Sequence, residues 1–119
     1  MNTLASTTLH SLPKIGDTAP DFTAVTTLGE ISAVFIIDPK GVVRLLVYYP
    51  LNVGRNIEEI KRVLLALQTA DKHAVALPAN WQEGEKVIVP APKTLADIER
   101  NDAADYEKID FYLQKKHLN

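Results

Sequence analysis

The sequence predicts an α/β fold, or α+β in strict description, with a β-hairpin, a helix and an extended C-terminal arm. Three observations predict it. Two apolar, β-branched runs flank a tight turn over residues 33–49. Apolar residues then recur at helical spacing over residues 57–67. A stretch rich in proline and turn residues follows, with short strand-like and helical patterns. With 119 residues, the chain has the length of one small domain.

The hairpin is the most sharply specified element. Residues 33–37 read Ala-Val-Phe-Ile-Ile, a run that suits a strand buried on both faces. Asp38-Pro39-Lys40-Gly41 then places Asp, Pro and Gly where a type I turn favours them. Residues 42–49 form the second strand, again β-branched and aromatic, so the two runs are predicted to pair in antiparallel fashion.

A helix is predicted after the loop that Pro50 and Gly54 bracket. Asn56 is the expected N-cap, and Glu59 stands where a capping box places its acidic member. Glu58 and Arg62 are four residues apart and can form an ion pair on the helix surface. Residues 69–73 are expected to leave the helix. Its apolar face is formed by Ile57, Ile60, Val63, Leu64 and Leu67.

The C-terminal arm is predicted to hold a strand and two helices. Residues 86–89 form the strand, and Thr94 with Asp97 caps a helix that runs to Arg100. Asn101 or Asp102 is expected to cap a last helix. Its predicted apolar positions are Tyr106, Ile109, Phe111 and Leu113, and its last turn holds Lys115, Lys116 and His117.

Composition excludes several classes of function. The net charge is −2, so no basic field attracts nucleic acid or an anionic membrane. No apolar run has the length of a membrane span, and the first residues lack the pattern of a secretory signal, so a cytoplasmic protein is expected. The chain has no cysteine, which excludes disulfides, thiolate chemistry and Cys-ligated zinc.

Three motifs together resemble the peroxiredoxin family, and specifically its one-cysteine, peroxiredoxin-6-type branch. They read FIIDPKGVVRLLVYYP, then GRNIEEIKRVLLALQ, then PANWxxGEKVIVP, and the resemblance runs from about Ala33 to Pro92. Near the start, GDTAPDF followed by TTLG resembles the opening of the same fold, where Pro20 and Phe22 would begin the chain and pack its first turn. The resemblance implies a thioredoxin-like fold and a thiol peroxidase activity in the family.

The resemblance also implies that a central block is missing. In the family that block carries the peroxidatic cysteine and its Thr/Ser, whereas here the opening segment joins the hairpin between Leu28 and Ala33. The family's activating arginine precedes AVFIID, where this chain has Ser32, so no catalytic residue is expected. Arg62 matches a second arginine of the family's pocket. The implied domains are 1–31, resembling the family's start, 32–70, the thioredoxin-like hairpin and helix, and 71–119, a C-terminal dimerisation arm.

Other site chemistry is weakly indicated. His10, His73 and His117 share no metal-ligand spacing, and isolated glycines form no phosphate loop, so no metal or cofactor is expected. No GxSxG motif supports a hydrolase. Arg62 and Arg55 are expected in ion pairs, the first with Glu58 or Glu59. The aromatic residues are expected to pack in a core or interface: Tyr48, Tyr49, Trp81, Tyr106, Phe111 and Tyr112.

The predicted function is therefore structural. The chain is expected to be a truncated, peroxidase-inactive peroxiredoxin-like protein that keeps the oligomerisation portion and forms a homodimer or larger oligomer, because a hairpin apolar on both faces needs covering. One alternative is another enzyme, such as a hydrolase, with a site at a new dimer interface built from His73, Glu83, Asp97 or Arg62. The other is a binding module that co-assembles with a full-length peroxiredoxin.

Overall fold

The hairpin and the C-terminal sheet belong to different units of the chain. The computed structural model describes residues 14–19 and 32–119, and these fall in two units, Met1–Arg55 and Asn56–Asn119. His10, Pro20, Phe22 and the segment 28–31, where the junction is predicted, lie outside the described residues.

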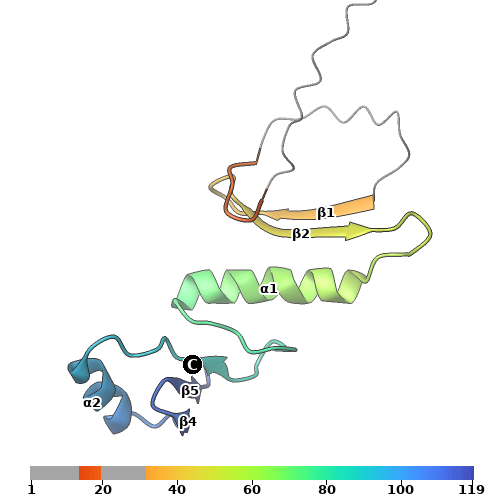
Figure 1. The fold of residues 1–119 in the computed structure, drawn as a ribbon. Coiled ribbons are helices and arrows are strands. Elements are labelled where there is room, and N and C mark those ends of the chain that lie inside the picture. The colour runs from red at the N-terminus through yellow and green to blue at the C-terminus, as the bar shows by residue number, and fades with distance from the viewer. Residues whose placement is uncertain (1–13, 20–31) are drawn as a thin grey trace, which may run out of the picture. The chain divides into compact units, whose positions relative to one another are not determined.

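The predicted hairpin is confirmed. Strand β1 (Ser32–Ile37) pairs antiparallel with β2 (Val43–Tyr49), and the two lie side by side in Figure 1. In the turn, the Gly41 amide donates to the Asp38 carbonyl over 2.9 Å, and Gly41 has φ +79°, a left-handed conformation that glycine adopts without strain. The Asp38 carboxylate accepts hydrogen bonds from the amides of Lys40 and Val42, which fixes the turn that connects the strands.

The opening segment adds a third, short pairing to this hairpin. The Gly16 amide donates to the Val43 carbonyl over 2.7 Å, and the Val43 amide donates to the Asp17 carbonyl over 2.8 Å. The Ala19 amide reaches the Gly41 carbonyl at 2.6 Å. Residues 16–19 therefore cover the outer edge of β2 where that strand begins. Sequence reasoning did not foresee this pairing, because it depends on a contact between segments more than 20 residues apart.

Few residues of the hairpin are buried. Among the described residues of this unit, only Ile36 and Val43 are buried apolar residues, with 9% and 1% of their surface exposed. Most of the remaining strand residues are half-buried, and Ile37 and Tyr48 are each 44% exposed. Within the described residues of this unit, β1 is therefore mostly half-buried, whereas a strand buried on both faces was expected.

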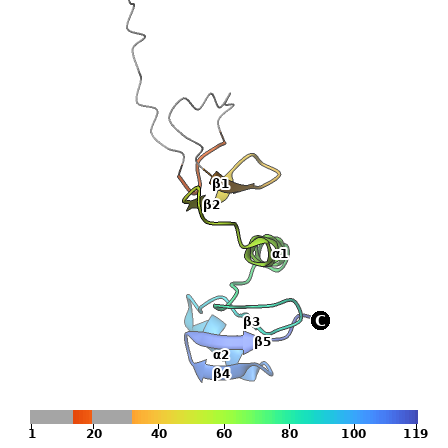
Figure 2. The ribbon, with the colours of Figure 1, turned by 90° about the vertical axis from the view of Figure 1, so that its right-hand side faces the viewer.

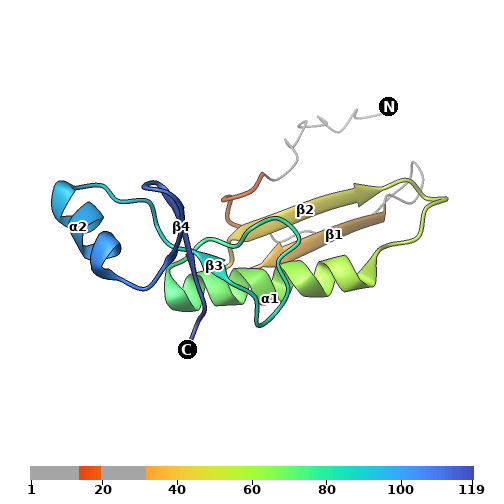
Figure 3. The ribbon, with the colours of Figure 1, turned by 90° about the horizontal axis from the view of Figure 1, so that it is seen from below.

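Helix α1 (Ile57–His73) opens the second unit and is longer than predicted. Asn56 is its N-cap, as expected, with its side chain accepting from the Glu59 amide. The helix does not end near residue 69; it runs unbroken to His73, and Ala74 closes it in the left-handed conformation (Figure 3). Residues 69–73 contain no glycine or proline, so nothing in their backbone ends the helix sooner.

The C-terminal arm forms a small antiparallel sheet and one helix, and the predicted last helix is wrong. Strands β3 (Val87–Ile88), β4 (Glu107–Asp110) and β5 (Leu113–Lys116) lie in the order β3-β5-β4, with α2 (Leu95–Ala103) beside them in Figure 2. The capping box of Thr94 and Asp97 is confirmed. Asn101 and Asp102 lie inside α2 and cap no later helix. Of the positions predicted for that helix, Ile109 lies in β4 and Leu113 in β5. Tyr106 precedes β4, and Phe111 lies in the turn between the two strands.

The core of this unit is also small. Its buried apolar residues among those described are Trp81, Val87 and Val89, with 2%, 0% and 7% of their surface exposed. Two polar residues are buried beside them, Asn101 on α2 and Gln114 on β5. The Oε1 atom of Gln114 is buried and has no hydrogen-bond partner among the described residues.

Candidate functional site

Arg62 is the centre of the most developed polar cluster in the second unit. Its Nε donates to Glu59 Oε2 over 2.6 Å, and its Nη2 donates to Glu59 Oε1 over 2.8 Å, so the guanidinium binds the carboxylate with two hydrogen bonds. Its Nη1 reaches the carbonyl of Trp81 at 3.4 Å. The side chain is 21% exposed. Arg62 therefore links α1 to the loop that follows it.

The predicted ion pair of Arg62 is confirmed, and of the two expected partners it is Glu59 that binds. Arg62 binds Glu59, three residues before it, rather than Glu58. The hydrogen bond from Arg62 lowers the pKa of Glu59, and the bond to Glu59 raises the pKa of Arg62 above its already high value. The two groups are therefore both charged at neutral pH, and Arg62 is held by a carboxylate of its own helix.

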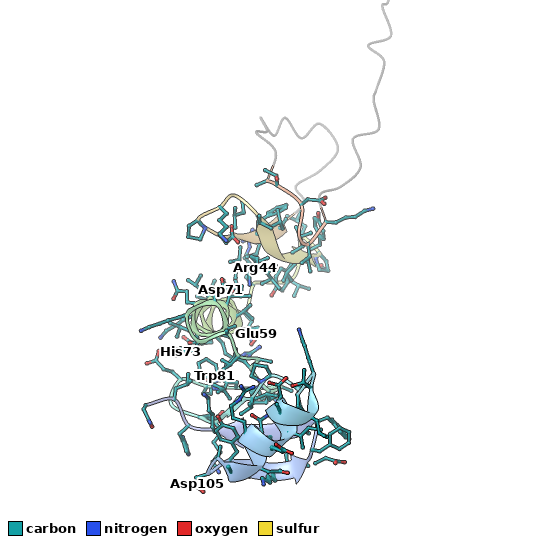
Figure 4. All side chains as sticks on the ribbon, turned by 90° about the vertical axis from the view of Figure 1, so that its left-hand side faces the viewer. Arg44, Glu59, Asp71, His73, Trp81 and Asp105 are labelled. Atoms are coloured by element: carbon teal, nitrogen blue, oxygen red, sulfur yellow. The ribbon has the colours of Figure 1, made fainter. Side chains whose placement is uncertain are left out.

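Trp81 is the buried apolar residue next to the Arg62 ion pair. The indole is 2% exposed, and its Nε1 donates to the carbonyl of Glu85 over 3.1 Å. The Gln82 amide donates to the Glu85 carboxylate over 2.9 Å, which closes the turn around the indole. In Figure 4, Glu59 lies on the side of α1 that faces the loop carrying Trp81. Sequence reasoning placed Trp81 in a core or interface but could not connect it with Arg62, 19 residues away.

An open pocket of about 420 Å³ lies beside this cluster. It is lined by Glu58, Lys61, Arg62 and Leu65 of α1 and by Trp81 and the two residues after it. Its charges are mixed, since Glu58 and Glu83 face the same space as the two cations. None of its lining residues is Ser, Thr, Cys or His, so the pocket offers no usual nucleophile or imidazole base.

A second pocket, of about 280 Å³, lies between residues 89–93 and α2. Asp97 lines it, but its carboxylate already accepts from the amides of Lys93 and Thr94 and forms an ion pair with Arg100. Hydrogen bonds from Thr94 and Lys93 lower the pKa of Asp97. Asp97 therefore caps α2 rather than offering a free base to a ligand.

The other residues named from the sequence are scattered. Ser32 begins β1, and Arg55 is exposed at the end of the first unit. His73 ends α1 and His117 follows β5; both are exposed, and neither lines the pockets above. The described residues contain no group of three His, Cys, Asp or Glu side chains arranged to hold a metal ion. Of the residues considered for an interface site, only Arg62 and Glu83 share a pocket.

The aromatic residues do not form one binding face. Trp81 is buried, whereas Phe111 and Tyr112 are exposed at the turn between β4 and β5, with their rings 5.3 Å apart and edge to face. Tyr48 packs edge to face against Phe35 in the hairpin, at 6.3 Å between ring centres. Lys116 lies over the Tyr106 ring at 5.7 Å. Across the described residues, no helix combines the length and the apolar character of a membrane span.

Known proteins match the chain in two ways, by sequence and by structure. Residues 66–100 match the family described as the C-terminal domain of 1-Cys peroxiredoxin. A peroxiredoxin 2 of Caldanaerobacter subterraneus is 49% identical over 97 residues, which is 80% of this chain and 44% of the relative. A peroxiredoxin of Aquifex aeolicus is 44% identical over 105 residues, covering 80% of this chain and 47% of the relative. The chain thus spans less than half the length of these relatives.

Solved structures give the same answer for the fold. A yeast mitochondrial 1-Cys peroxiredoxin, studied for its thiol resolving mechanism via glutathione and thioredoxin systems, matches with a TM-score of 0.63 and 38% identity. The match covers 72% of this chain and 40% of that one. A cysteine-to-serine mutant of peroxiredoxin 6 from Arenicola marina matches with a TM-score of 0.61 and 31% identity, over 73% of this chain and 41% of that one.

The motifs, the relatives and the fold all point to peroxiredoxins, although the chain contains no cysteine. The hairpin and α1 are the thioredoxin-like elements that the motifs predicted. Trp81 lies within residues 66–100, the part that matches the C-terminal domain of the one-cysteine branch. The chain is related to the peroxiredoxin family, and its residues 66–100 match the C-terminal domain of the one-cysteine branch.

Proposed function

We propose that the chain is a peroxidase-inactive member of the peroxiredoxin family whose role is assembly. The observation that carries the proposal is the absence of cysteine from all 119 residues. A peroxide is reduced in this family by a thiolate nucleophile, and no other side chain in the sequence supplies that chemistry. The proposal includes the cytoplasmic location that the composition favours.

The surroundings of Arg62 support the same conclusion. A guanidinium that activates a peroxide must direct free N–H groups toward the substrate. Here Nε and Nη2 donate to Glu59, and Nη1 lies 3.4 Å from the Trp81 carbonyl. Arg62 therefore acts as a structural clamp between α1 and the Trp81 loop. At the position of the family's activating arginine, this chain has Ser32, which has no positive charge to offer.

The small cores support a role in assembly. The described residues of each unit bury only two or three apolar side chains, whereas several large apolar residues stay exposed. A two-stranded hairpin is at best marginally stable alone in water. In the hairpin unit the exposed residues are Ile15, Ile37, Tyr48, Leu51 and Val53. A partner chain would cover such surface, and a second copy of this chain is the partner that is always present.

Peroxide turnover tests the first half of the proposal. Purified chain is mixed with hydrogen peroxide or an organic hydroperoxide and dithiothreitol, and peroxide loss is followed beside a cysteine-containing full-length peroxiredoxin. We expect the rate to equal that of buffer with dithiothreitol alone. Turnover above that background, unchanged in the presence of a metal chelator, would contradict the proposal.

Light scattering after size-exclusion chromatography tests the second half. We expect a mass of at least twice the 13.2 kDa of one chain at micromolar concentration. A folded species of 13.2 kDa would contradict the role in assembly.

A further inference from the structure

The pocket between residues 89–93 and α2 contains a buried amide that no described residue binds. Asn101 lines this pocket and is 9% exposed, and its side chain makes no hydrogen bond with a described residue. Burying an amide without a partner costs free energy, so buried polar side chains are almost always bonded to protein, water or a ligand. Among the described residues, Gln114 Oε1 is the one fully enclosed side-chain atom without a partner, so the Asn101 amide still reaches accessible space. The pocket that it lines provides that space.

Two cations line the same pocket with donors that remain available. Arg100 is 72% exposed, and its Nη2 donates to Asp97, whereas its Nε and Nη1 bond to no described residue. The Lys93 ammonium forms no ion pair with a described residue either. Asp97 is ionised at neutral pH, because hydrogen bonds from Thr94 and Lys93 lower its pKa. One carboxylate and two cations therefore leave a net charge of +1 at the pocket.

The remaining wall of the pocket is apolar and offers few backbone donors. It is formed by the segment Val89-Pro90-Ala91-Pro92. The Val89 amide donates to β5, and proline has no N–H to add. The Lys93 and Thr94 amides at the start of α2 already donate to Asp97. Phosphate is usually bound by several converging backbone amides or at a free helix N-terminus, and this pocket offers neither.

A small carboxylate with a short apolar chain has the chemistry that this pocket complements. Its charge is opposite to that of the pocket, and its two oxygens can accept from the guanidinium, the ammonium and the N–H groups of Asn101. Its alkyl chain can lie against Val89 and the two prolines. The volume of about 280 Å³ lies just below the range of drug-sized sites, so a small molecule or the end of a peptide fits.

We propose that the pocket between residues 89–93 and α2 binds a small monocarboxylate, with Lys93 and Arg100 holding its charge and Asn101 bonding its oxygens. A free organic acid and the C-terminal carboxylate of a peptide share this chemistry. The site lies wholly within the second unit and does not depend on the assembly role. Ligand binding and the mass in light scattering can therefore fail independently.

Nuclear magnetic resonance of the isotope-labelled chain tests the site with butyrate as the probe. Titration at constant ionic strength should shift the backbone amides of Ala91 and Arg100 and the side-chain amide of Asn101. Saturation is expected at a dissociation constant on the order of 1 mM, because so small a ligand makes few contacts. An unshifted Asn101 side chain would overturn the proposal. If inorganic phosphate saturates the same resonances at a lower concentration than butyrate, the carboxylate assignment is wrong.

Butyramide is the matched ligand, since it has the shape of butyrate without the charge. It should bind about tenfold more weakly, because its hydrogen bonds to the two cations are no longer charge-assisted on both sides. Equal binding of butyrate and butyramide would refute the role given to Lys93 and Arg100.

Single substitutions locate the charge that binds the ligand. Lys93→Gln and Arg100→Gln each neutralise an exposed side chain, and each should raise the dissociation constant of butyrate about three- to tenfold. Lys61→Gln is the matched control, because Lys61 lines the pocket beside Arg62, and it should leave butyrate binding unchanged. If Lys61→Gln weakens binding as much as Lys93→Gln does, the ligand occupies the other pocket and the proposal falls. Thermal unfolding checks that each variant keeps the fold.

An acetylated alanyl-valine dipeptide distinguishes the two sources of the carboxylate, when its free and its amidated C-terminal forms are compared. If the free form binds more tightly than butyrate and the amidated form does not bind, the site recognises the end of a peptide. If butyrate binds at least as tightly as the free form, the site is one for a free organic acid. If the amidated form binds as tightly as the free form, the site does not recognise a carboxylate, and the proposal is overturned.

Discussion

Replacing Trp81 by alanine is the sharpest test of how the second unit is held together. Trp81 is 2% exposed and is the largest of the three buried apolar side chains described in this unit. A buried Trp→Ala change costs about 3–5 kcal/mol, because the transfer energy is lost and a cavity remains. The lost hydrogen bond to the Glu85 carbonyl adds little, because Glu85 is exposed and water can replace the indole N–H.

This loss is a large part of the stability of so small a unit. Small domains have only about 5–15 kcal/mol in total, and 1 kcal/mol shifts Tm by about 4–8 °C at this size. We therefore expect Trp81→Ala to lower Tm by more than about 12 °C or to leave the unit unfolded at 25 °C. Trp81→Phe, which keeps most of the ring, should lose clearly less.

Urea unfolding followed by far-UV circular dichroism measures the effect, since the variant lacks the chain's single tryptophan and its fluorescence. Tyr112→Ala is the control, because that ring is 55% exposed and its loss should change the free energy of unfolding by less than about 0.5 kcal/mol. If Trp81→Ala costs less than about 1 kcal/mol, Trp81 is not the centre of this core and the account of the Arg62 cluster fails with it.

Three further predictions concern charge and partners. Arg62→Met keeps the apolar stem of the side chain and removes its hydrogen bonds to Glu59 and to the Trp81 carbonyl. The variant should lower the free energy of unfolding in urea less than Trp81→Ala does, and it should leave the background rate of peroxide loss unchanged. An altered rate of peroxide loss would show that Arg62 has a chemical role. The folded-state pKa values of Glu59 and Asp97 lie below their ordinary 4.5 and 3.8, so the stability that the two carboxylates contribute is present at neutral pH and is lost as the pH falls through the lowered values. Tm should therefore drop below about pH 4.5, and Asp97→Asn should reduce part of that drop. If the variant's Tm depends on acid pH as the original chain's does, Asp97 does not stabilise α2 as a cap. Tagged chain mixed with a full-length one-cysteine peroxiredoxin should retain only its own copies after washing, as judged by mass spectrometry, and stoichiometric recovery of the peroxiredoxin would favour co-assembly instead.

The sequence determined the elements whose residues act locally. The turn at Asp38–Gly41, the N-cap at Asn56 and the capping box at Thr94 and Asp97 were all predicted, because each depends on side chains within a few residues of the backbone that they bind. The resemblance to peroxiredoxins and the absence of a thiol were also evident without a structure, since both depend only on residue identity and order.

Tertiary structure decided the rest. The segment 107–116 has residues at helical spacing, yet it forms β4 and β5, because pairing with β3 and with each other satisfies its backbone and its β-branched and aromatic residues suit strands. The contact of Arg62 with the Trp81 carbonyl and the pairing of residues 16–19 with β2 join segments far apart in the chain. No local pattern encodes such contacts, because their energy exists only once folding has brought the two segments together.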